Sequence, residues 1–286
     1  MRAFSLIVVA VSLAACSTLI APLALDPGSD ITAFSHDELD AVLEQYVDSE
    51  GRVDYAGLRR EPERLERYYA QVAASSPDRD PGRFPDAASR LAYWINAYNA
   101  AVLVSVVRLD GIRSVRDVKA PWYLGLLPEG TGFFYYRKHR FGGETICLYD
   151  VENSIVRPRF ADPRIHFALN CASIGCPKLP ARAFRPEDLD RRLDEEARRF
   201  FAEPRNLSID EANGTVRLSM ILDWYAEDFL DWLEREGEAD GGLVAYAARY
   251  APAAVADRLR GAAREYRVEF VPYDWGLNDS AAPTGQ

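Results

Sequence analysis

The sequence is poor in histidine and cysteine, with three and four of them in 286 residues. No Cys-x-x-Cys or Cys-x-x-His spacing occurs, which argues against a zinc ribbon and against a thioredoxin-type redox centre. The phosphate-binding patterns G-x-x-x-x-G-K-[ST] and G-x-G-x-x-G are also missing. A net charge of −10 argues against a nucleic-acid-binding role, which needs a basic face. We therefore expect no cofactor, no metal and no nucleic-acid partner.

The composition is that of an ordinary globular protein. Hydrophobic residues make up 48% of the chain and charged residues 27%, which is enough for a sizeable core. No internal repeat is visible. We expect a single globular domain over residues 34–278, followed by a disordered tail at 279–286.

The N-terminus has the anatomy of a bacterial secretory signal. Arg2 gives a short positive segment, and an apolar run from Phe4 to Leu13 follows it. Cys16 comes directly after Leu-Ala-Ala, and this resembles the lipobox of bacterial lipoproteins, in which the cysteine is lipidated and becomes the first residue. The apolar run is too short to span a membrane comfortably.

This signal predicts where in the cell the protein is located. We expect residues 1–15 to be removed and residues 16–33 to form a lipidated tether without fixed structure. The lipid on Cys16 would hold the protein at the membrane surface. Because Ser17 and not aspartate follows the cysteine, the resemblance favours the periplasmic face of the outer membrane.

The strongest predicted helix runs from Ala87 to Val107. It is apolar nearly all round, which indicates a helix buried in the middle of the fold. Its length would allow a membrane span, but Asn96, Asn99 and Ser105 favour a core helix. Asn96 and Asn99 are three residues apart and share one face, so they either fasten the helix to neighbouring backbone or line a pocket.

The remaining pattern is helical with short hairpins. Apolar spacing predicts further helices at 37–47, 62–74, 186–201, 222–234, 241–249 and 253–265. Turn signals at Gly142-Gly143 and Asn213-Gly214 predict the strand pairs 133–141 with 144–148 and 207–210 with 215–219. A last strand is expected at 266–272. The fold class is therefore α+β: a mostly helical domain with a buried central helix and a small, largely antiparallel sheet.

Chemistry-bearing residues concentrate in the stretch from Arg164 to Pro180. Its apolar first half, Ile165 to Cys171, predicts a buried strand that runs into a turn. Alternation along that strand would place His166 and Asn170 on one face and Cys171 on the other. A Cys-His pair would then need a bulge, the second thiol Cys176 on the returning loop, or another histidine such as His139.

A thiol with an imidazole nearby is the arrangement of thiol-based acyl transfer. Cys171 or Cys176 would be the nucleophile, His166 the base, and Glu152 or Asn170 the group that orients the imidazole. Two other readings stay open. His166 can be a hydrogen-bonded core histidine while Cys171 and Cys176 form a disulfide, or the two cysteines can be a redox pair.

A binding role is the alternative to catalysis. Asn96, Asn99, Arg157 and Arg164 carry amide and guanidinium groups that suit an anionic ligand in a pocket. His139, His166 and Glu152 are possible metal ligands in kind, but they lack the close spacing of a metal site.

Several blocks of the sequence resemble the bacterial and plant family called domain of unknown function 547. Together they span about residues 40–278. The blocks are Tyr93-Trp-Ile-Asn-Ala-Tyr-Asn-Ala100, Asp150-Val-Glu152 with Arg157, Arg164 to Cys171 with Cys176-Pro177, Trp224-Tyr225 through Asp228-Phe229, and Tyr273-Asp-Trp-Gly-Leu-Asn278. This chain departs from the pattern at Asn153, where a histidine is expected after the glutamate.

The family name implies no activity. The N-terminal signal and the cysteine and histidine residues lead us to expect an envelope lipoprotein. It would act as a thiol-dependent hydrolase or acyl transferase, or else be a non-catalytic periplasmic module that binds an anionic ligand or a partner protein. Its partner would be a small molecule or an envelope protein.

Overall fold

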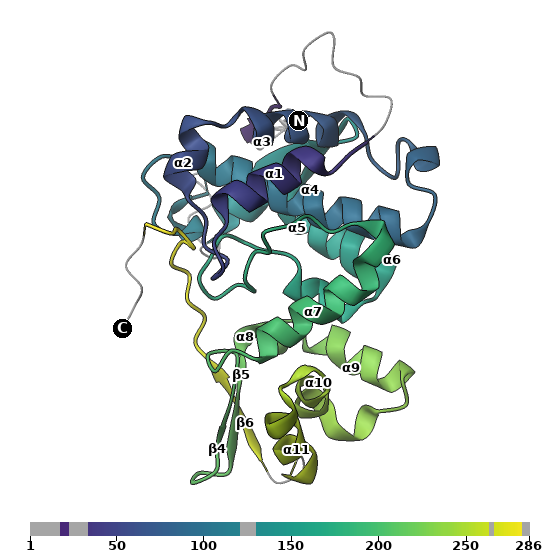
Figure 1. The fold of residues 1–286 in the computed structure, drawn as a ribbon, viewed down its shortest axis with the longest axis vertical. Helices are drawn as coiled ribbons and strands as arrows, with labels where there is room; N and C mark the ends of the chain where they lie inside the picture. Colours follow the sequence, from purple (N-terminus) through teal and green to yellow (C-terminus); the bar gives the residue numbers. More distant parts are fainter. Residues whose placement is uncertain (1–17, 23–33, 121–129, 263–265, 282–286) are drawn as a thin grey trace, which may run out of the picture.

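A computed structural model describes residues 18–22, 34–120, 130–262 and 266–281. The predicted signal peptide, the lipidation site at Cys16 and most of the tether lie outside these residues. Helices dominate, as Figure 1 shows. They are α1 (Asp37–Tyr46), α2 (Tyr55–Arg60), α3 (Glu63–Ala74), α4 (Ala87–Arg108), α5 (Leu148–Asp150), α6 (Arg157–Phe160), α7 (Leu189–Phe201), α8 (Met220–Trp224), α9 (Ala226–Arg235), α10 (Gly242–Tyr250) and α11 (Ala253–Ala262).

Short 3-10 and π-helical turns lie between many of these helices. The 3-10 turns are η1 (Pro81–Arg83), η2 (Val115–Asp117), η6 (Pro163–Phe167), η7 (Pro186–Asp188) and η8 (Ala239–Gly241). Two π turns, η4 (Gly132–Tyr136) and η5 (Val151–Val156), flank one hairpin. Such π turns are rare and occur often at functional sites.

The strands form two three-stranded sheets. The first contains β1 (Thr18–Ile20), β2 (Arg137–Phe141) and β3 (Glu144–Cys147), and the second contains β4 (Leu207–Asp210), β5 (Thr215–Ser219) and β6 (Arg267–Val271). Each sheet combines one antiparallel hairpin with one parallel strand. The predicted α+β class is confirmed, with two small mixed sheets where one largely antiparallel sheet was expected.

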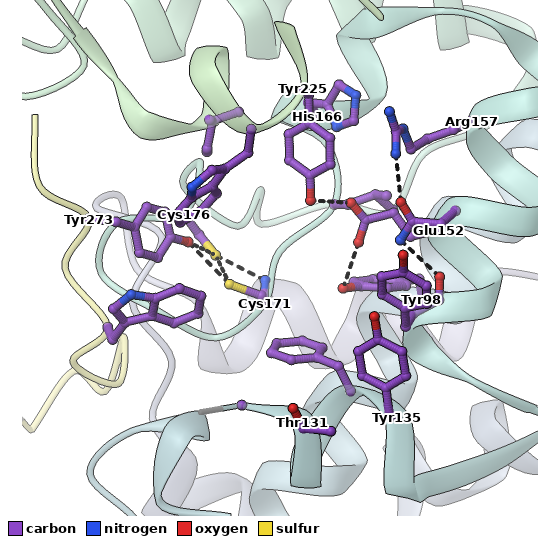
Figure 2. A pocket seen from close by; sticks show the side chains of 18 of the residues that line it. Tyr98, Thr131, Tyr135, Glu152, Arg157, His166, Cys171, Cys176, Tyr225 and Tyr273 are labelled. Carbon is purple, nitrogen blue, oxygen red and sulfur yellow. Dashed lines mark hydrogen bonds between the residues drawn. The ribbon is translucent and has the colours of Figure 1, made fainter. Parts of the chain in front are cut away.

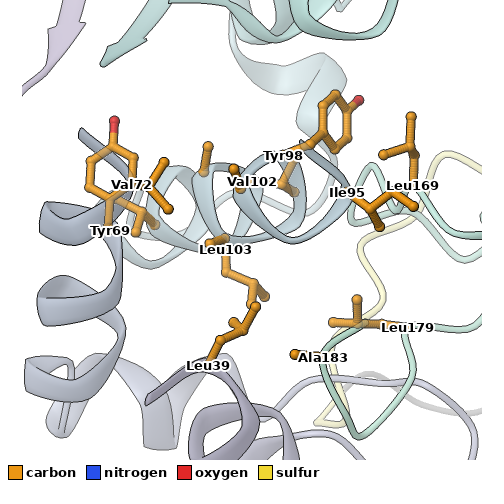
Figure 3. Close-up of a cluster of buried hydrophobic side chains, with 14 of the residues drawn as sticks. Leu39, Tyr69, Val72, Ile95, Tyr98, Val102, Leu103, Leu169, Leu179 and Ala183 are labelled. Carbon is orange, nitrogen blue, oxygen red and sulfur yellow. The ribbon is translucent and has the colours of Figure 1, made fainter. Parts of the chain in front are cut away.

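Helix α4 is the centre of the larger hydrophobic core, as predicted. Every residue from Leu91 to Val107 is buried, and Figure 3 shows side chains from several elements packed against the helix. Its start is fixed by a capping box: the Asp86 side chain accepts from the backbone N–H of Ser89, and the Ser89 hydroxyl accepts from the backbone N–H of Asp86. No helix among the described residues is long and apolar enough to cross a membrane.

The two asparagines of α4 fasten the helix to neighbouring loops. Asn96 donates to the carbonyl of Phe184 at 2.7 Å and accepts from the N–H of the same residue at 2.9 Å. Asn99 donates to the carbonyl of Ala168 and accepts from the N–H of Asn170, each at 2.9 Å. Of the two predicted roles for these amides, the structure shows the fastening role.

A second core fills the other part of the molecule. It joins α7, α9, α10 and the β4–β5–β6 sheet, which Figure 1 shows below α7 and α8. Phe167 belongs to this second core, whereas Ile165, Ala168 and Leu169 belong to the core around α4. The segment that carries His166 therefore lies where the two cores meet.

The predicted strand Ile165–Cys171 is wrong. Residues Pro163–Phe167 form the 3-10 turn η6, and the chain continues irregularly to Cys171. The turn begins because Asp162 accepts the N–H of Arg164 and proline occupies the first position. Strand alternation, which would have placed His166 and Cys171 on opposite faces, therefore does not apply to this segment.

Four smaller expectations also change. The tether predicted to lack fixed structure contains the strand β1, because Thr18–Ile20 pair with β2. The predicted strand 133–141 begins as the turn η4 and becomes a strand only at Arg137. The predicted helix 222–234 is two helices, α8 and α9, which break at Tyr225. The predicted tail begins in an ordered segment, because the N–H of Ser280 donates to the carbonyl of Val53 at 3.0 Å. Residues 282–286 of that tail lie outside the described residues.

Candidate functional site

A cavity of about 1000 Å³ opens at the junction of the two cores. Figure 2 shows that cysteine, carboxylate and tyrosine side chains converge on it. Aromatic rings supply much of its wall. The lining residues are Tyr98, Gly130, Thr131, Phe134, Tyr135, Tyr136, Lys138, Tyr149, Glu152, Asn153, Arg157, His166, Leu169, Cys171, Cys176, Pro177, Ile221, Trp224, Tyr225, Tyr273 and Trp275. Apolar walls with a few convergent polar groups are typical of a small-molecule site.

Two free thiols lie in contact in this cavity. The sulfurs of Cys171 and Cys176 are 2.6 Å apart, and the backbone N–H of Cys171 donates to Cys176 Sγ at 3.0 Å. The hydroxyl of Tyr273 lies 3.2 Å from Cys171 Sγ and 3.0 Å from Cys176 Sγ. Cys171 is half-buried, whereas Cys176 is only 3% exposed. The pair is therefore asymmetric, and Cys171 is the more exposed of the two residues.

The loop that holds the thiols is fixed from both ends. The side chain of Asn170 donates to the carbonyl of Pro177 at 2.7 Å and accepts from the N–H of Ala172 at 2.8 Å. Ala172 has a φ of +62°, a left-handed backbone conformation that costs an alanine strain and persists only where surrounding contacts hold it. Asn170 therefore closes the thiol loop. Its side-chain amide binds backbone groups, whereas the prediction was that it would bind the His166 imidazole.

The C-terminal segment crosses this loop. Gly175 donates to the carbonyl of Asp274 at 2.8 Å, and Ile174 donates to that of Gly276 at 2.7 Å. A Cβ at Gly175 would lie 2.9 Å from the Tyr273 ring and from the Asp274 nitrogen, so only glycine allows this approach. These contacts bring the Tyr273 hydroxyl to the two sulfurs.

The surroundings separate the acidities of the two thiols. The hydrogen bond from Cys176, together with those from Tyr273 and Ser173, lowers the pKa of Cys171 despite its burial. Burial raises the pKa of Cys176 well above its usual range, and the thiolate character of Cys171 adds to this rise. Burial also raises the pKa of Tyr273, so its hydroxyl keeps the proton that it shares with the sulfurs. Cys171 is therefore the thiol that ionises first.

His166 is held by a different carboxylate from the predicted one. Its Nε2 lies 2.7 Å from Oδ2 of Asp228, and Asp228 also accepts two hydrogen bonds from Arg157 at 2.7 and 2.9 Å. Burial by itself would raise the pKa of Asp228, but the hydrogen bonds from His166 and Arg157 hold it well below its usual range. The aspartate is therefore an anion between Arg157 and His166, in a partly buried Arg-Asp-His chain.

Glu152 projects into the cavity from the π turn η5. It accepts a hydrogen bond from the Tyr225 hydroxyl at 2.5 Å and one from Tyr98 at 3.5 Å. The next residue, Asn153, stands where the family resemblance predicts histidine, and its side-chain Oδ1 accepts from Arg157 at 2.6 Å. Asn153 thus supports the guanidinium that holds Asp228.

The predicted residues divide between the cavity and its surroundings. Cys171, Cys176, His166 and Glu152 all line it, but the hydrogen bonds of the described residues join neither thiol to His166. Neither Glu152 nor Asn170 orients the imidazole, because Asp228 does so. The expected Cys-His pair is therefore replaced by a Cys-Cys-Tyr cluster.

The four residues expected to bind an anion do not gather around one described cavity. Only Arg157 lines the large cavity, and Asp228 neutralises it. Arg164 pairs with Asp162, Asp190 and Asp194 instead. Asn96 and Asn99 are buried against backbone, as described above.

The other histidines are structural. Burial lowers the pKa of His139 to about 3, and its ring contacts the hydroxyls of Tyr69 and Ser105. Among the described residues, no group of three or more histidine, cysteine, aspartate or glutamate side chains is placed to hold a metal ion.

Sequence reasoning assigned no role to Tyr225, Asp228 or Tyr273. Each lies far along the chain from its partner: His166 and Asp228 are 62 positions apart, and Cys171 and Tyr273 are 102 positions apart. The family resemblance quotes all three positions, and that was the signal available for them.

The fold and cavity define an α+β protein with a paired-thiol pocket. Residues 84–201 match the family model described as "Protein of unknown function, DUF547". This stretch is therefore a DUF547 domain, and it carries Glu152, His166, Cys171 and Cys176. Comparison with curated proteins gave no match, and neither did comparison with solved structures.

Proposed function

We propose that the protein is a thiol-dependent hydrolase or acyl transferase in which Cys171 is the nucleophile. The observation that carries this proposal is the position of the Cys171 sulfur. It lines a cavity of about 1000 Å³ and is half-buried, and hydrogen bonds from its neighbours lower its pKa. A thiolate is the reactive form of cysteine, so this environment favours attack on a bound carbonyl group.

The chemistry follows from the groups around the sulfur. The thiolate of Cys171 adds to the carbonyl carbon of an acyl substrate and forms a carbon–sulfur bond. Expulsion of the leaving group, with its bonding electron pair, gives a thioester on Cys171. Water then releases the acid in hydrolysis, or an amine or alcohol accepts the acyl group in transfer. Either step regenerates the thiolate.

The aromatic wall and Glu152 complete the site. Tyr135 and Tyr149 stack with centroids 4.1 Å apart, and Trp224 packs on Tyr273 at 4.9 Å. These rings offer apolar surface to a substrate, while Glu152 is a carboxylate that can accept a proton from an attacking water or acceptor. His166 is a positioning residue, since it supports the Tyr225 ring that donates to Glu152.

An acyl probe tests this proposal. We expect p-nitrophenyl acetate to acetylate Cys171, with a burst of p-nitrophenolate close to one equivalent per protein. Cys171→Ser should abolish the burst. Cys147→Ser is the matched control, because Cys147 is buried and burial raises its pKa. A wild-type protein that binds substrates in the cavity but forms no acyl-enzyme would instead support a non-catalytic module for a small molecule or an envelope protein.

The cellular location of the protein is the subject of a separate proposal. The charged and apolar N-terminal segment followed by Leu-Ala-Ala-Cys16 supports lipid attachment at Cys16 and anchoring at the periplasmic face of the outer membrane. We expect the full-length protein to fractionate with outer membranes and Cys16→Ser to shift it to the soluble periplasmic fraction. Membrane association that survives this substitution would contradict the lipid anchor.

A further inference from the structure

In acyl transfer Cys176 only donates a hydrogen bond to the Cys171 sulfur, and the reactivity of its own sulfur is not used. The two sulfurs are 2.6 Å apart and both are free thiols. Acyl transfer requires one nucleophilic sulfur, so a second buried thiol in contact with it calls for another chemistry. Sulfur atoms in contact are what formation of a disulfide requires.

The loop keeps the sulfurs together without needing to refold. The N–H of Cys176 donates to the carbonyl of Ser173 at 3.1 Å, and that of Cys171 donates to Cys176 Sγ at 3.0 Å. Arg205 donates to the carbonyl of Cys176 at 3.2 Å, and Asn170 holds the carbonyl of the next residue, Pro177. These contacts hold the backbone around both thiols in place, so the second sulfur can reach the first without rearrangement of the loop.

The two thiols also differ in access. Both cysteines line the cavity, but Cys171 is half-buried whereas Cys176 is only 3% exposed. A molecule that enters the cavity therefore meets the Cys171 sulfur first. This difference suits Cys171 as the attacking cysteine and Cys176 as the resolving cysteine of a thiol–disulfide exchange.

We propose that Cys171 and Cys176 carry out thiol–disulfide exchange with a low-molecular-weight organic disulfide bound in the cavity. The inference rests on the proposed function to the extent that both need Cys171 as an accessible nucleophile. A small disulfide is the substrate class that fits, because the attacking sulfur lies inside a cavity and not on an exposed ridge.

The exchange balances in two steps. The Cys171 thiolate attacks one sulfur of the substrate disulfide, forms a mixed disulfide and releases the other half as a thiolate. That thiolate takes the proton of Cys176, and the Cys176 sulfur then attacks Cys171 Sγ. The Cys171–Cys176 disulfide forms and the second half of the substrate leaves as a thiolate. The Cys171 thiolate and the Cys176 thiol are together oxidised by two electrons, and the substrate disulfide is reduced to one thiol and one thiolate, which takes a proton from water.

The test uses the reduced full-length chain and bis(2-hydroxyethyl) disulfide. Reactions are stopped with acid, and remaining thiols are alkylated before digestion with trypsin. Cleavage after Arg164 and Lys178 gives one peptide, residues 165–178, that contains both cysteines and no other cysteine. Its mass separates the internal disulfide, which lacks two hydrogens, from the mixed disulfide, which gains a hydroxyethylthio group.

We expect the wild-type peptide to be recovered as the internal disulfide, with two equivalents of 2-mercaptoethanol released per protein. Cys176→Ser should stop at the mixed disulfide on Cys171 and release one equivalent. Cys147→Ser should behave as wild type. The wild-type result decides the matter even if the Cys176 variant folds poorly.

Other outcomes separate this inference from the proposed function. A wild-type protein that stops at the mixed disulfide would overturn the resolving role of Cys176 while leaving Cys171 a nucleophile. If iodoacetamide alkylates Cys171 in the protein but bis(2-hydroxyethyl) disulfide does not react with it, the exchange alone would be overturned. A peptide with both thiols inert to both reagents would overturn the exchange and the proposed function together.

Discussion

The phenol ring of Tyr225 lies flat on the imidazole of His166, with ring centroids 3.8 Å apart and an angle of 21° between the planes. Asp228 holds the edge of that imidazole, and Arg157 holds Asp228 while its guanidinium lies 5.1 Å above the Tyr225 ring. Tyr225 in turn donates to Glu152. The position of the Glu152 carboxylate in the cavity therefore depends on the half-buried ion pair of Arg157 and Asp228.

Asp228→Asn tests this dependence. The substitution leaves Arg157 without its anion in a half-buried place, and breaking such a pair costs about 3 kcal/mol of unfolding free energy. It should also lower the rate of any reaction that uses Glu152. Urea denaturation measures the first effect. The nearby exposed Asp231→Asn should change stability by less than about 0.5 kcal/mol; equal losses in the two variants would contradict the role given to Asp228.

Tyr273→Phe should raise the pKa of Cys171. The hydroxyl that approaches both sulfurs is lost, and a hydrogen bond to a charged group is worth about 1.5–3 kcal/mol, or roughly one to two pKa units. The pH dependence of iodoacetamide alkylation at Cys171, read from peptide 165–178, measures the shift. Tyr266→Phe removes a hydroxyl that has no contact with the thiols and should leave the profile unchanged. An unshifted profile in Tyr273→Phe would show that its hydroxyl does not stabilise the thiolate.

Asn99→Ala should destabilise the fold and loosen the thiol loop together. The side chain pairs two buried backbone groups, those of Ala168 and Asn170, and leaving them unpaired costs about 1–3 kcal/mol each. Denaturation should show the loss, and alkylation of the otherwise inert Cys176 should become faster. Asn213→Ala, in an exposed hairpin turn, is the control for alkylation: it loses its own hydrogen bond to Asp210 but should leave the protection of Cys176 unchanged. Normal protection of Cys176 in the Asn99 variant would contradict the link between helix α4 and the loop.

Stability should fall with acidification well before the carboxylates titrate. Burial, aided by Arg185, lowers the pKa of His36 from 6.5 to about 4. The unfolded chain therefore binds a proton between these values while the folded chain does not, so unfolding becomes more favourable as pH falls from 6.5 to 4. His139 follows the same rule over a wider range. Between pH 6.5 and 4 each histidine contributes a loss of up to about 3 kcal/mol, because one pKa unit corresponds to about 1.4 kcal/mol.

Denaturation curves at pH 7, 6, 5 and 4 check this slope. In His36→Gln the slope should become shallower, although stability at pH 7 also falls because the ring pairs with Tyr68 and Asn96. A variant with the same slope as wild type would show that His36 is not buried in its neutral form.

Sequence alone identified the elements whose signals are local. Helix α4 combines a long apolar run with Asp86 and Ser89 at its start, and the Asn213-Gly214 turn sets the β4–β5 hairpin. The segment after Pro163 is too short for periodicity to separate strand from helical turn. The Asp162-Pro163 pair was a helix-start signal that outweighed the apolar run.

The site was predictable only in part for a related reason. Cys171, Cys176, His166 and Glu152 are unusual residues in a short stretch, so composition draws attention to them. Their partners Tyr225, Asp228 and Tyr273 are common residue types that arrive from distant helices and from the C-terminal segment. Nothing in their local sequence indicates which side chain they will meet, because tertiary packing decides it.

The crossing of the C-terminal segment over Gly175 bears on where the working unit of this chain ends. The stretch that matches the family stops at residue 201, but the phenol that touches both sulfurs comes from Tyr273. Tyr55, near the other end of the described chain, binds Asn278 at 2.7 Å and ties that segment to the N-terminal helices. An excised fragment cut at the family boundaries would therefore carry both thiols and lack the hydroxyl that contacts both sulfurs.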